Sequence, residues 1–286
     1  MKYIRGFFMA WGNFTALPCP YRKWHEEARR AMLCMLPLMG LIMGGITAVL
    51  LFVLEVLGAP PLLMGVLLTA AYFMMTGFIH VDGFMDCSDA IMSRRPDMAE
   101  RQRILKDPAV GAFAVVAVCM MFMIFAASMI TLAGKTSVQG IFVIPVIFAV
   151  SRALAADAVM RYPVMGTSQY SHMKDRGGDM RIAECLILCL TGILPIIVIY
   201  QLAVRIFAGG SGGAIGGAGV IGVIGDPGGL IVYFGSVAAV LIAETIACHN
   251  DRKQLGGMNG DVSGHMIVTG ETAGLLAAAL LTSVFL

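Results

Sequence analysis

The chain has little charge for its length. Only 13% of its 286 residues are Asp, Glu, Lys or Arg and 58% are hydrophobic, whereas typical soluble domains carry about 25% charged residues. This balance excludes a soluble globular domain, and a net charge of +2 gives no reason to expect nucleic acid as a partner. The seven cysteines form no CxxC pair and lie mostly within apolar runs, which favours buried thiols over metal or redox chemistry.

Apolar runs long enough to cross a lipid bilayer recur from residue 31 to the C-terminus. A spanning helix needs about 20 mostly apolar residues, and these runs lack the period-two alternation of a membrane barrel. We therefore expect an all-α, polytopic transmembrane bundle that forms a single integral membrane domain over residues 1–286. Seven spans are predicted, at about residues 31–57, 62–80, 109–133, 138–160, 184–206, 229–248 and 265–286.

Lysine and arginine concentrate in alternate connections between these spans. The basic connections are the N-terminal segment and residues 80–108, 161–183 and 249–264. Because cytoplasmic loops collect positive charge, this predicts a multi-pass protein of the cell membrane with a cytoplasmic N-terminus and a polar cytoplasmic face. The glycine-rich residues 207–230 are expected to form a flexible outer loop.

A stripe of three aspartates follows a run of 24 uncharged residues, Val56 to Ile79. In GFIHVDGFMDCSDA, residues 77–90, Asp82, Asp86 and Asp89 stand at i, i+4 and i+7, within about 60 degrees of one another on a helix. Carboxylates so close together need a counter-charge, and oxygen ligands suit Mg²⁺, with Mn²⁺ as an alternative. A solvated acidic helix end at the interface is the other interpretation.

The next cytoplasmic segment, SRRPDMAERQRILKDPAVGAF, begins at Ser93 and carries a basic cluster that includes Arg94 and Arg95. Pro96 followed by acidic residues predicts a short amphipathic helix. The basic side chains fit either a phosphate group or anionic lipid. Asp107 before Pro108 is either the cap of the next span or a ligand.

The last cytoplasmic segment reads QLGGMNGDVSGHMIVTGE, residues 254–271. Gly257 and Gly260 belong to a turn whose backbone could approach a phosphate, and Asp261 lies where the last span begins. Glu271 lies two turns further into that span, and an intramembrane carboxylate is costly enough to indicate a functional or paired role. Arg152, also within a span, fits either a buried ion pair or substrate binding.

His80 stands two positions before Asp82, so a continuous helix would turn its ring about 160 degrees away from the aspartates. A break in the helix at Gly83 would instead allow the ring to reach the site.

These segments resemble the cobalamin synthase family, the adenosylcobinamide-GDP ribazoletransferases. HVDGFMDCSDA is similar to the family's His-Leu-Asp-Gly-Leu-Ala-Asp-Thr-Ala-Asp-Gly signature, and other family elements follow in order. They are FTALPCP, LPLMGLIMG, LKDPAVGAF, AVSRA and LGGMNGDVSGHMIVTGE. Departures from the pattern include Ala90 for glycine and Asn259 for threonine.

The resemblance implies an Mg²⁺-dependent transferase of the EC 2.7.8 class. It would join adenosylcobinamide-GDP to α-ribazole or α-ribazole 5'-phosphate at the cytoplasmic face and release GMP. By analogy, Asp82, Asp86, Asp89 and Asp261 would hold the metal, while Asp89, with Asp86 and Glu271, would be catalytic. The expected substrate-binding residues are His80, Arg94, Arg95, Asp107, Arg152, Arg161, Gly257 and Gly260.

Two alternatives fit parts of the same pattern. A CDP-alcohol phosphatidyltransferase also places aspartates at the end of a span, but its Asp-Gly-x-x-Ala-Arg motif fails here because Asp86 and Cys87 follow Met85. A secondary transporter would use Asp157, Glu244 and Glu271 as an ion relay, but it should show an inverted repeat, and the sequence has no convincing one. The sequence carries no indication of an oligomeric state.

Overall fold

The structure is a computed structural model that describes residues 1–135, 138–166, 168 and 227–285. The described residues form helices, joined by short connections and one isolated β-bridge between Val164 and Met258. The elements in chain order are α1 (Lys2–Phe14), η1 (Glu26–Ala28), α2 (Arg29–Cys34), α3 (Leu36–Val56), α4 (Pro61–Thr76), α5 (Ile79–Met92), α6 (Met98–Ile104), α7 (Ala112–Gly134), α8 (Val138–Arg161), α11 (Pro227–Leu255) and α12 (Gly260–Phe285).

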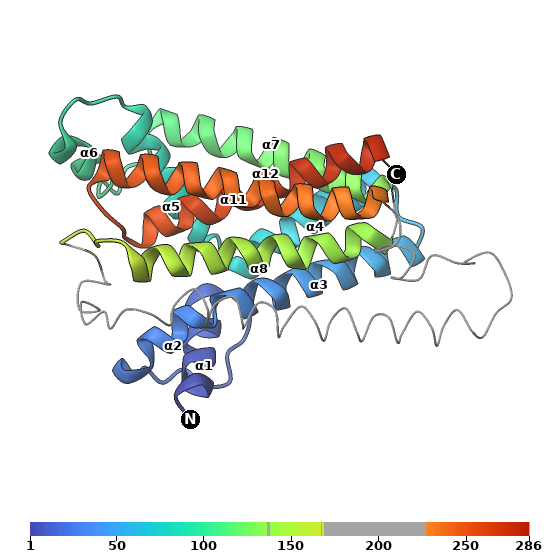
Figure 1. The fold of residues 1–286 in the computed structure, drawn as a ribbon, viewed down its shortest axis with the longest axis horizontal. Helices are drawn as coiled ribbons and strands as arrows, with labels where there is room; N and C mark the ends of the chain where they lie inside the picture. The colour runs from blue at the N-terminus through green and yellow to red at the C-terminus, as the bar shows by residue number, and fades with distance from the viewer. Residues whose placement is uncertain (136–137, 167, 169–226, 286) are drawn as a thin grey trace, which may run out of the picture.

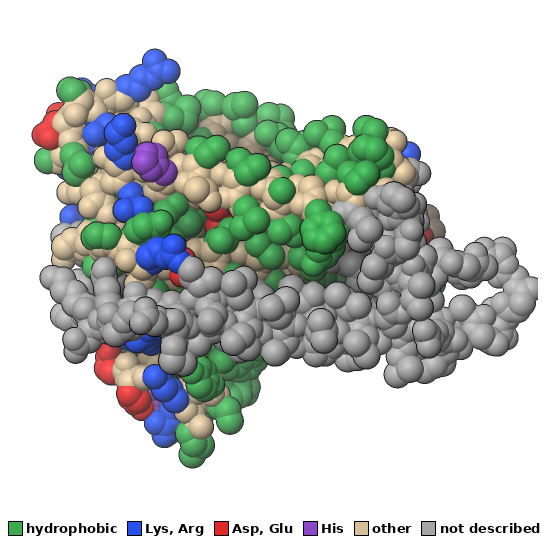
Figure 2. All heavy atoms as spheres, viewed as in Figure 1, with side chains coloured by type: hydrophobic (Ala, Val, Ile, Leu, Met, Phe, Trp, Pro, Cys, Tyr) green, Lys and Arg blue, Asp and Glu red, His purple; other side chains and the backbone are tan. Residues whose placement is uncertain are grey.

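The long helices run side by side as an elongated bundle (Figure 1). Its centre is α12, which packs against α5, α7, α8 and α11, while α3 packs on α8 and α4 on α7. Lysine and arginine side chains gather on the end of the bundle that carries α6, whereas green hydrophobic side chains cover much of the remaining visible surface (Figure 2). We call the end that carries α6 the polar end.

Within the described part of the chain, five helices are each long and apolar enough to cross a membrane. They are Leu36–Val56, Ala112–Gly134, Val143–Arg161, Ile231–Leu255 and Gly260–Phe285. These five match predicted spans, which confirms the all-α polytopic fold. The predicted span at 184–206 and the glycine-rich residues 207–226 lie outside the described residues, and residues 227–230 belong to α11.

The predicted span at 62–80 differs from the structure at its end. Helix α4 stops at Thr76, and α5 continues after a bend of 90°. Gly77 and Phe78 both adopt left-handed backbone conformations, with φ of 60° and 59°. A left-handed glycine ends many helices, but the same conformation is rare for a bulky residue such as Phe78. Two such residues in succession redirect the chain, so α5 leaves the axis of α4.

Two further boundaries correct the sequence prediction. The predicted loop 249–264 is mostly helical, because α11 continues to Leu255 and α12 begins at Gly260. Of the two roles left open for Asp107, that of the cap of α7 is excluded, because the helix begins at Ala112 with Gly111 as its N-cap. The short helix after Pro96 is present as α6, with Asp97 as its cap.

Candidate functional site

The three aspartates of the predicted stripe share one helix and one face. Helix α5 is continuous through Gly83, and it leaves Asp82 exposed and Asp86 and Asp89 half-buried. The residues on its opposite side, His80, Cys87 and Ser88, are buried in the bundle. The sequence prediction of a helical carboxylate stripe is therefore confirmed.

Helix α12 brings a fourth carboxylate, that of Asp261, to this stripe. The backbones of α5 and α12 touch at Gly83, where an added Cβ would lie 2.7 Å from the Cα of Asp261. Helix α5 lies outside the five long apolar helices, and burial together with the charges of Asp82, Asp261 and Asp89 raises the pKa of Asp86 to about 6. The four aspartates thus form one acidic cluster at the polar end.

The acidic cluster has no cationic partner among the described residues, since none of their ion pairs includes any of the four aspartates. Within the same residues, no three His, Cys, Asp or Glu side chains are already arranged to hold a metal ion. The cluster is therefore an uncompensated group of carboxylates and not a closed metal cage.

The segment before α7 closes one side of the acidic cluster. An added Cβ on Gly111 would lie 2.0 Å from Oδ2 of Asp89, so this carboxylate lies directly against the backbone at the start of α7. Asp107 is exposed, and its Oδ1 accepts a hydrogen bond of 3.0 Å from the backbone N–H of Ala109. Asp107 therefore caps a turn that precedes the helix.

The glycine turn between α11 and α12 is fixed to the chain that follows α8. The N–H of Met165 donates to the carbonyl oxygen of Met258, and the N–H of Met258 donates to that of Pro163, both at 2.9 Å. An added Cβ on Gly257, whose φ is 158°, would lie 2.9 Å from the nitrogen of Met165. The close approach of this protein backbone accounts for the glycine at 257.

Gly260 is the first residue of α12, directly after Asn259. The side chain of Asn259 accepts a hydrogen bond of 2.8 Å from the N–H of Val262 and donates one of 2.7 Å to Oδ2 of Asp261. This one side chain therefore caps α12 and holds a carboxylate of the acidic cluster.

The predicted basic residues differ in what they contact. Arg94 and Arg95 are exposed in the turn between α5 and α6, and Nε of Arg95 lies 3.9 Å from Oε2 of Glu100. Arg161, at the end of α8, pairs with Asp157 one turn earlier, at 3.1 Å. The polar end thus presents Arg94 and Arg95 with their side chains in solvent.

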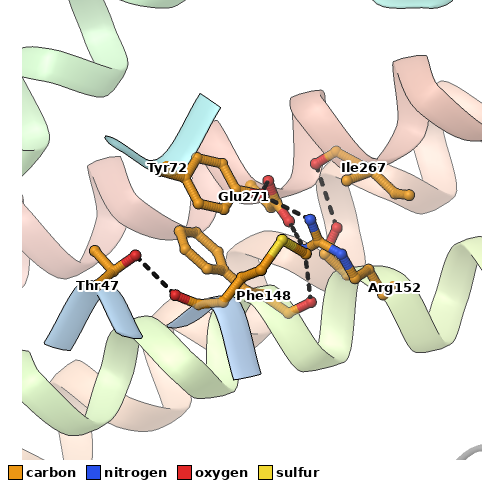
Figure 3. Close-up of polar contacts among 8 residues, drawn as sticks. Thr47, Tyr72, Phe148, Arg152, Ile267 and Glu271 are labelled. Atoms are coloured by element: carbon orange, nitrogen blue, oxygen red, sulfur yellow. Dashed lines mark hydrogen bonds and ion pairs between the residues drawn. The ribbon is translucent and has the colours of Figure 1, made fainter. Parts of the chain in front are cut away.

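Arg152 and Glu271 lie in the bundle interior and bind each other. Figure 3 shows the guanidinium of Arg152 directed at the carboxylate of Glu271, beside the ring of Tyr72. The hydroxyl of Tyr72 donates to the same carboxylate, and Nη2 of Arg152 donates to that hydroxyl at 2.9 Å. Both charged side chains are at most 1% exposed. Glu271 lies ten residues beyond Asp261 along α12, so this pair is away from the acidic cluster.

His80 is also buried. Its ring stacks on that of Phe14 at 6.1 Å, and its Nε2 has no hydrogen-bond partner in the described part of the chain. The backbone of His80 packs against Gly264 of α12. The continuous α5 thus places His80 on the buried side of the helix, as its spacing from Asp82 predicts.

Sequence reasoning missed a histidine–aspartate pair next to α5. Nδ1 of His265 lies 2.7 Å from Oδ2 of the buried Asp251, and the imidazole ring stacks on Phe84 at 5.2 Å. The pair joins α11 to α12, and it was missed because Asp251 was assigned to a loop. Tyr72 was missed because it lies within an uncharged run.

The apolar bundle and the acidic cluster define a polytopic helical membrane protein with an anionic site at its polar end. A family model described as cobalamin-5-phosphate synthase matches residues 6–279. The chain belongs to this cobalamin-5-phosphate synthase family.

Relatives named adenosylcobinamide-GDP ribazoletransferase match the chain from end to end. The protein of Clostridium perfringens (strain 13 / Type A) is 28% identical over 280 residues, which are 98% of this chain and 99% of the relative. That of Clostridium botulinum (strain Alaska E43 / Type E3) is 30% identical over 282 residues, 98% of each chain. No solved structure matches the chain.

Proposed function

We propose that the protein is an adenosylcobinamide-GDP ribazoletransferase, which joins adenosylcobinamide-GDP and α-ribazole, or its phosphate, with release of GMP. The observation that carries this proposal is the acidic cluster. Asp261 of α12 joins the three aspartates of α5, and no cationic side chain pairs with them in the described part of the chain. The name shared by relatives that cover 98% of the chain supports the same activity.

The reaction is a transfer at phosphorus. A ribazole hydroxyl oxygen forms a bond to the phosphorus that carries the cobinamide, the bond from that phosphorus to the GMP oxygen breaks, and the hydroxyl releases its proton. Such transfers depend mainly on positioning the reactants and neutralising phosphate charge. The diphosphate is itself anionic, so it cannot bind beside four aspartates unless a cation lies between them.

The donor set of the acidic cluster fits Mg²⁺, with Mn²⁺ as an alternative. Mg²⁺ prefers oxygen ligands and is commonly held by one or two carboxylates plus substrate phosphates, so a preformed group of three protein ligands is not required. Asp82, Asp86, Asp89 and Asp261 are the residues that would hold the ion, which would neutralise charge on the diphosphate.

The other side chains of the polar end fit supporting roles. Arg94 and Arg95 are exposed cations near the end of α5 and would bind phosphate oxygens of GMP or of the ribazole. Arg152 and Glu271 are buried and bound to each other, so we assign them the role of holding α8 and α12 together. The arginine-rich polar end would face the cytoplasm of a cell membrane.

The test is GMP release by the full chain purified in detergent, from adenosylcobinamide-GDP and α-ribazole. We expect release to require Mg²⁺ or Mn²⁺, to stop with EDTA, and to fall by roughly 100-fold or more in Asp82→Asn, since a group that stabilises phosphate charge is lost.

The matched control is Asp97→Asn at the same end of the bundle. Asp97 caps α6 by accepting from the N–H of Ala99 at 3.1 Å, and asparagine caps equally well. We expect this variant to keep wild-type turnover. GMP release that persists in Asp82→Asn, or in EDTA, would overturn the assigned site, and a wild type that releases no GMP would overturn the function.

A further inference from the structure

Asn259 is the cap of α12 and also the hydrogen-bond partner of Asp261. Its Oδ1 accepts from the N–H of Val262, and its Nδ2 donates to Oδ2 of Asp261 at 2.7 Å. If the amide were rotated by half a turn, its NH₂ group would face the N–H of Val262, and its oxygen would face Oδ2 of Asp261. The two contacts therefore fix the orientation of the amide.

The hydrogen bond occupies only one oxygen of the Asp261 carboxylate. Oδ1 of Asp261 has no hydrogen-bond partner in the described part of the chain. It is also not among the fully buried atoms that lack a partner there, so it is accessible. A carboxylate held by a hydrogen bond at one oxygen loses rotational freedom, while its other oxygen stays available as a ligand.

We infer that Asn259 is a positioning residue, which holds the Asp261 carboxylate in the orientation that binds a divalent cation. This inference rests on the proposed function, because it assigns Asp261 to the cation site. Partners that orient metal ligands typically change affinity by about 10- to 100-fold when removed. Capping alone does not require an N–H group, since serine caps helices as well as asparagine does.

Two variants separate the cap from the positioning contact. Asn259→Ser keeps a capping oxygen, but its single donor is a hydroxyl one bond closer to the backbone than the amide N–H, and so further from Oδ2 of Asp261. Asn259→Ala lacks both. We expect the thermal midpoint in detergent to stay near the wild-type value in Asn259→Ser and to fall in Asn259→Ala.

The decisive readout is Mn²⁺ binding by the purified full chain, measured by electron paramagnetic resonance without substrate. We expect both variants to bind Mn²⁺ roughly 10-fold more weakly than the wild type, with Asp261→Asn as the positive control. If Asn259→Ser binds Mn²⁺ as tightly as the wild type, and Mn²⁺ affinity falls only in the variant whose thermal midpoint falls, the inference is overturned.

GMP release by the wild type separates this inference from the proposed function. A wild type that releases GMP, with Asn259→Ser unchanged in Mn²⁺ affinity, overturns the positioning role and leaves the function standing. Weaker Mn²⁺ binding in Asn259→Ser supports the positioning role even in a preparation that releases no GMP.

Discussion

At the scale of single residues, the interior pair of Arg152 and Glu271 shows what a charge requires inside an apolar bundle. Arg152 has Glu271, the hydroxyl of Tyr72 and the carbonyl oxygen of Phe148 as partners, the last at 3.2 Å. A charge buried without a partner costs several kcal/mol. Removing one member of a buried ion pair is therefore far more destabilising than replacing both members by apolar residues. The contacts among Tyr72, Arg152 and Glu271 therefore hold helices α4, α8 and α12 together.

This argument predicts a large effect for Glu271→Gln. The substitution removes the ion-pair partner of the buried Arg152 charge, and we expect it to destabilise the protein by about 3–5 kcal/mol. The measurement is the thermal unfolding midpoint in detergent. Glu55→Gln is the control, because Glu55 is exposed on α3 and should leave the midpoint unchanged.

A double variant, Arg152→Met with Glu271→Leu, removes both charges together. We expect it to recover much of the stability that Glu271→Gln loses, since apolar side chains of similar volume replace buried ion pairs at little cost. A midpoint of Glu271→Gln equal to that of the wild type would show that the pair does not stabilise the bundle.

At the scale of helices, the site depends on how closely α5 approaches α12. The contact at Gly83 is backbone to backbone, and Gly264 of α12 packs in the same way against His80. Small residues at such crossings allow helices in membranes to approach closely. Because Gly83 and Gly264 have no side chains, they determine how closely the aspartates of α5 approach Asp261.

We expect Gly83→Ala to separate the two helices. Its Cβ would lie 2.7 Å from the Cα and 2.8 Å from the carbonyl oxygen of Asp261, so backbone must move. Overpacking of this kind costs about 1–3 kcal/mol, and it should also weaken Mn²⁺ binding because Asp261 shifts. Gly45→Ala on α3 is the control, because nothing lies within 4 Å of its added Cβ.

For Gly45→Ala we expect equal or slightly higher stability, since alanine is a better helix former than glycine by about 1 kcal/mol. The measurements are the thermal midpoint and Mn²⁺ affinity of both variants. If Gly83→Ala and Gly45→Ala have equal thermal midpoints and equal Mn²⁺ affinities, the helix crossing at Gly83 tolerates a side chain.

At the scale of the whole molecule, apolar runs and motif order were sufficient to predict the bundle and the family. Composition and span length fix which segments become helices, because the bilayer leaves the backbone no other way to satisfy its hydrogen bonds. The i, i+4, i+7 spacing of Asp82, Asp86 and Asp89 also placed them on one helical face.

Tertiary contacts decided the features that the sequence did not predict. The bend at Phe78 requires an unfavourable left-handed residue, and the close packing at Gly257 depends on Met165, which is far away in the sequence. The contacts of His265 with Asp251 and of Asn259 with Asp261 became visible only with the exact ends of α11 and α12.

The orientation of the whole bundle gives a final prediction. Helix α6, with Arg103, lies at the polar end, and the connection between α3 and α4, with Leu57, lies at the opposite end (Figure 1). Both residues are exposed. Because lysine and arginine favour the cytoplasmic side, Arg103 should be inside and Leu57 outside.

The measurement uses Arg103→Cys and Leu57→Cys in a chain whose seven native cysteines are replaced by alanine. In right-side-out membrane vesicles, a membrane-impermeant maleimide should label Leu57→Cys at once and Arg103→Cys only after permeabilisation. Labelling of Arg103→Cys in sealed vesicles would place the acidic cluster on the outer face. The diphosphate substrate would then have to bind from outside the cell, against the positive-inside pattern of the whole chain.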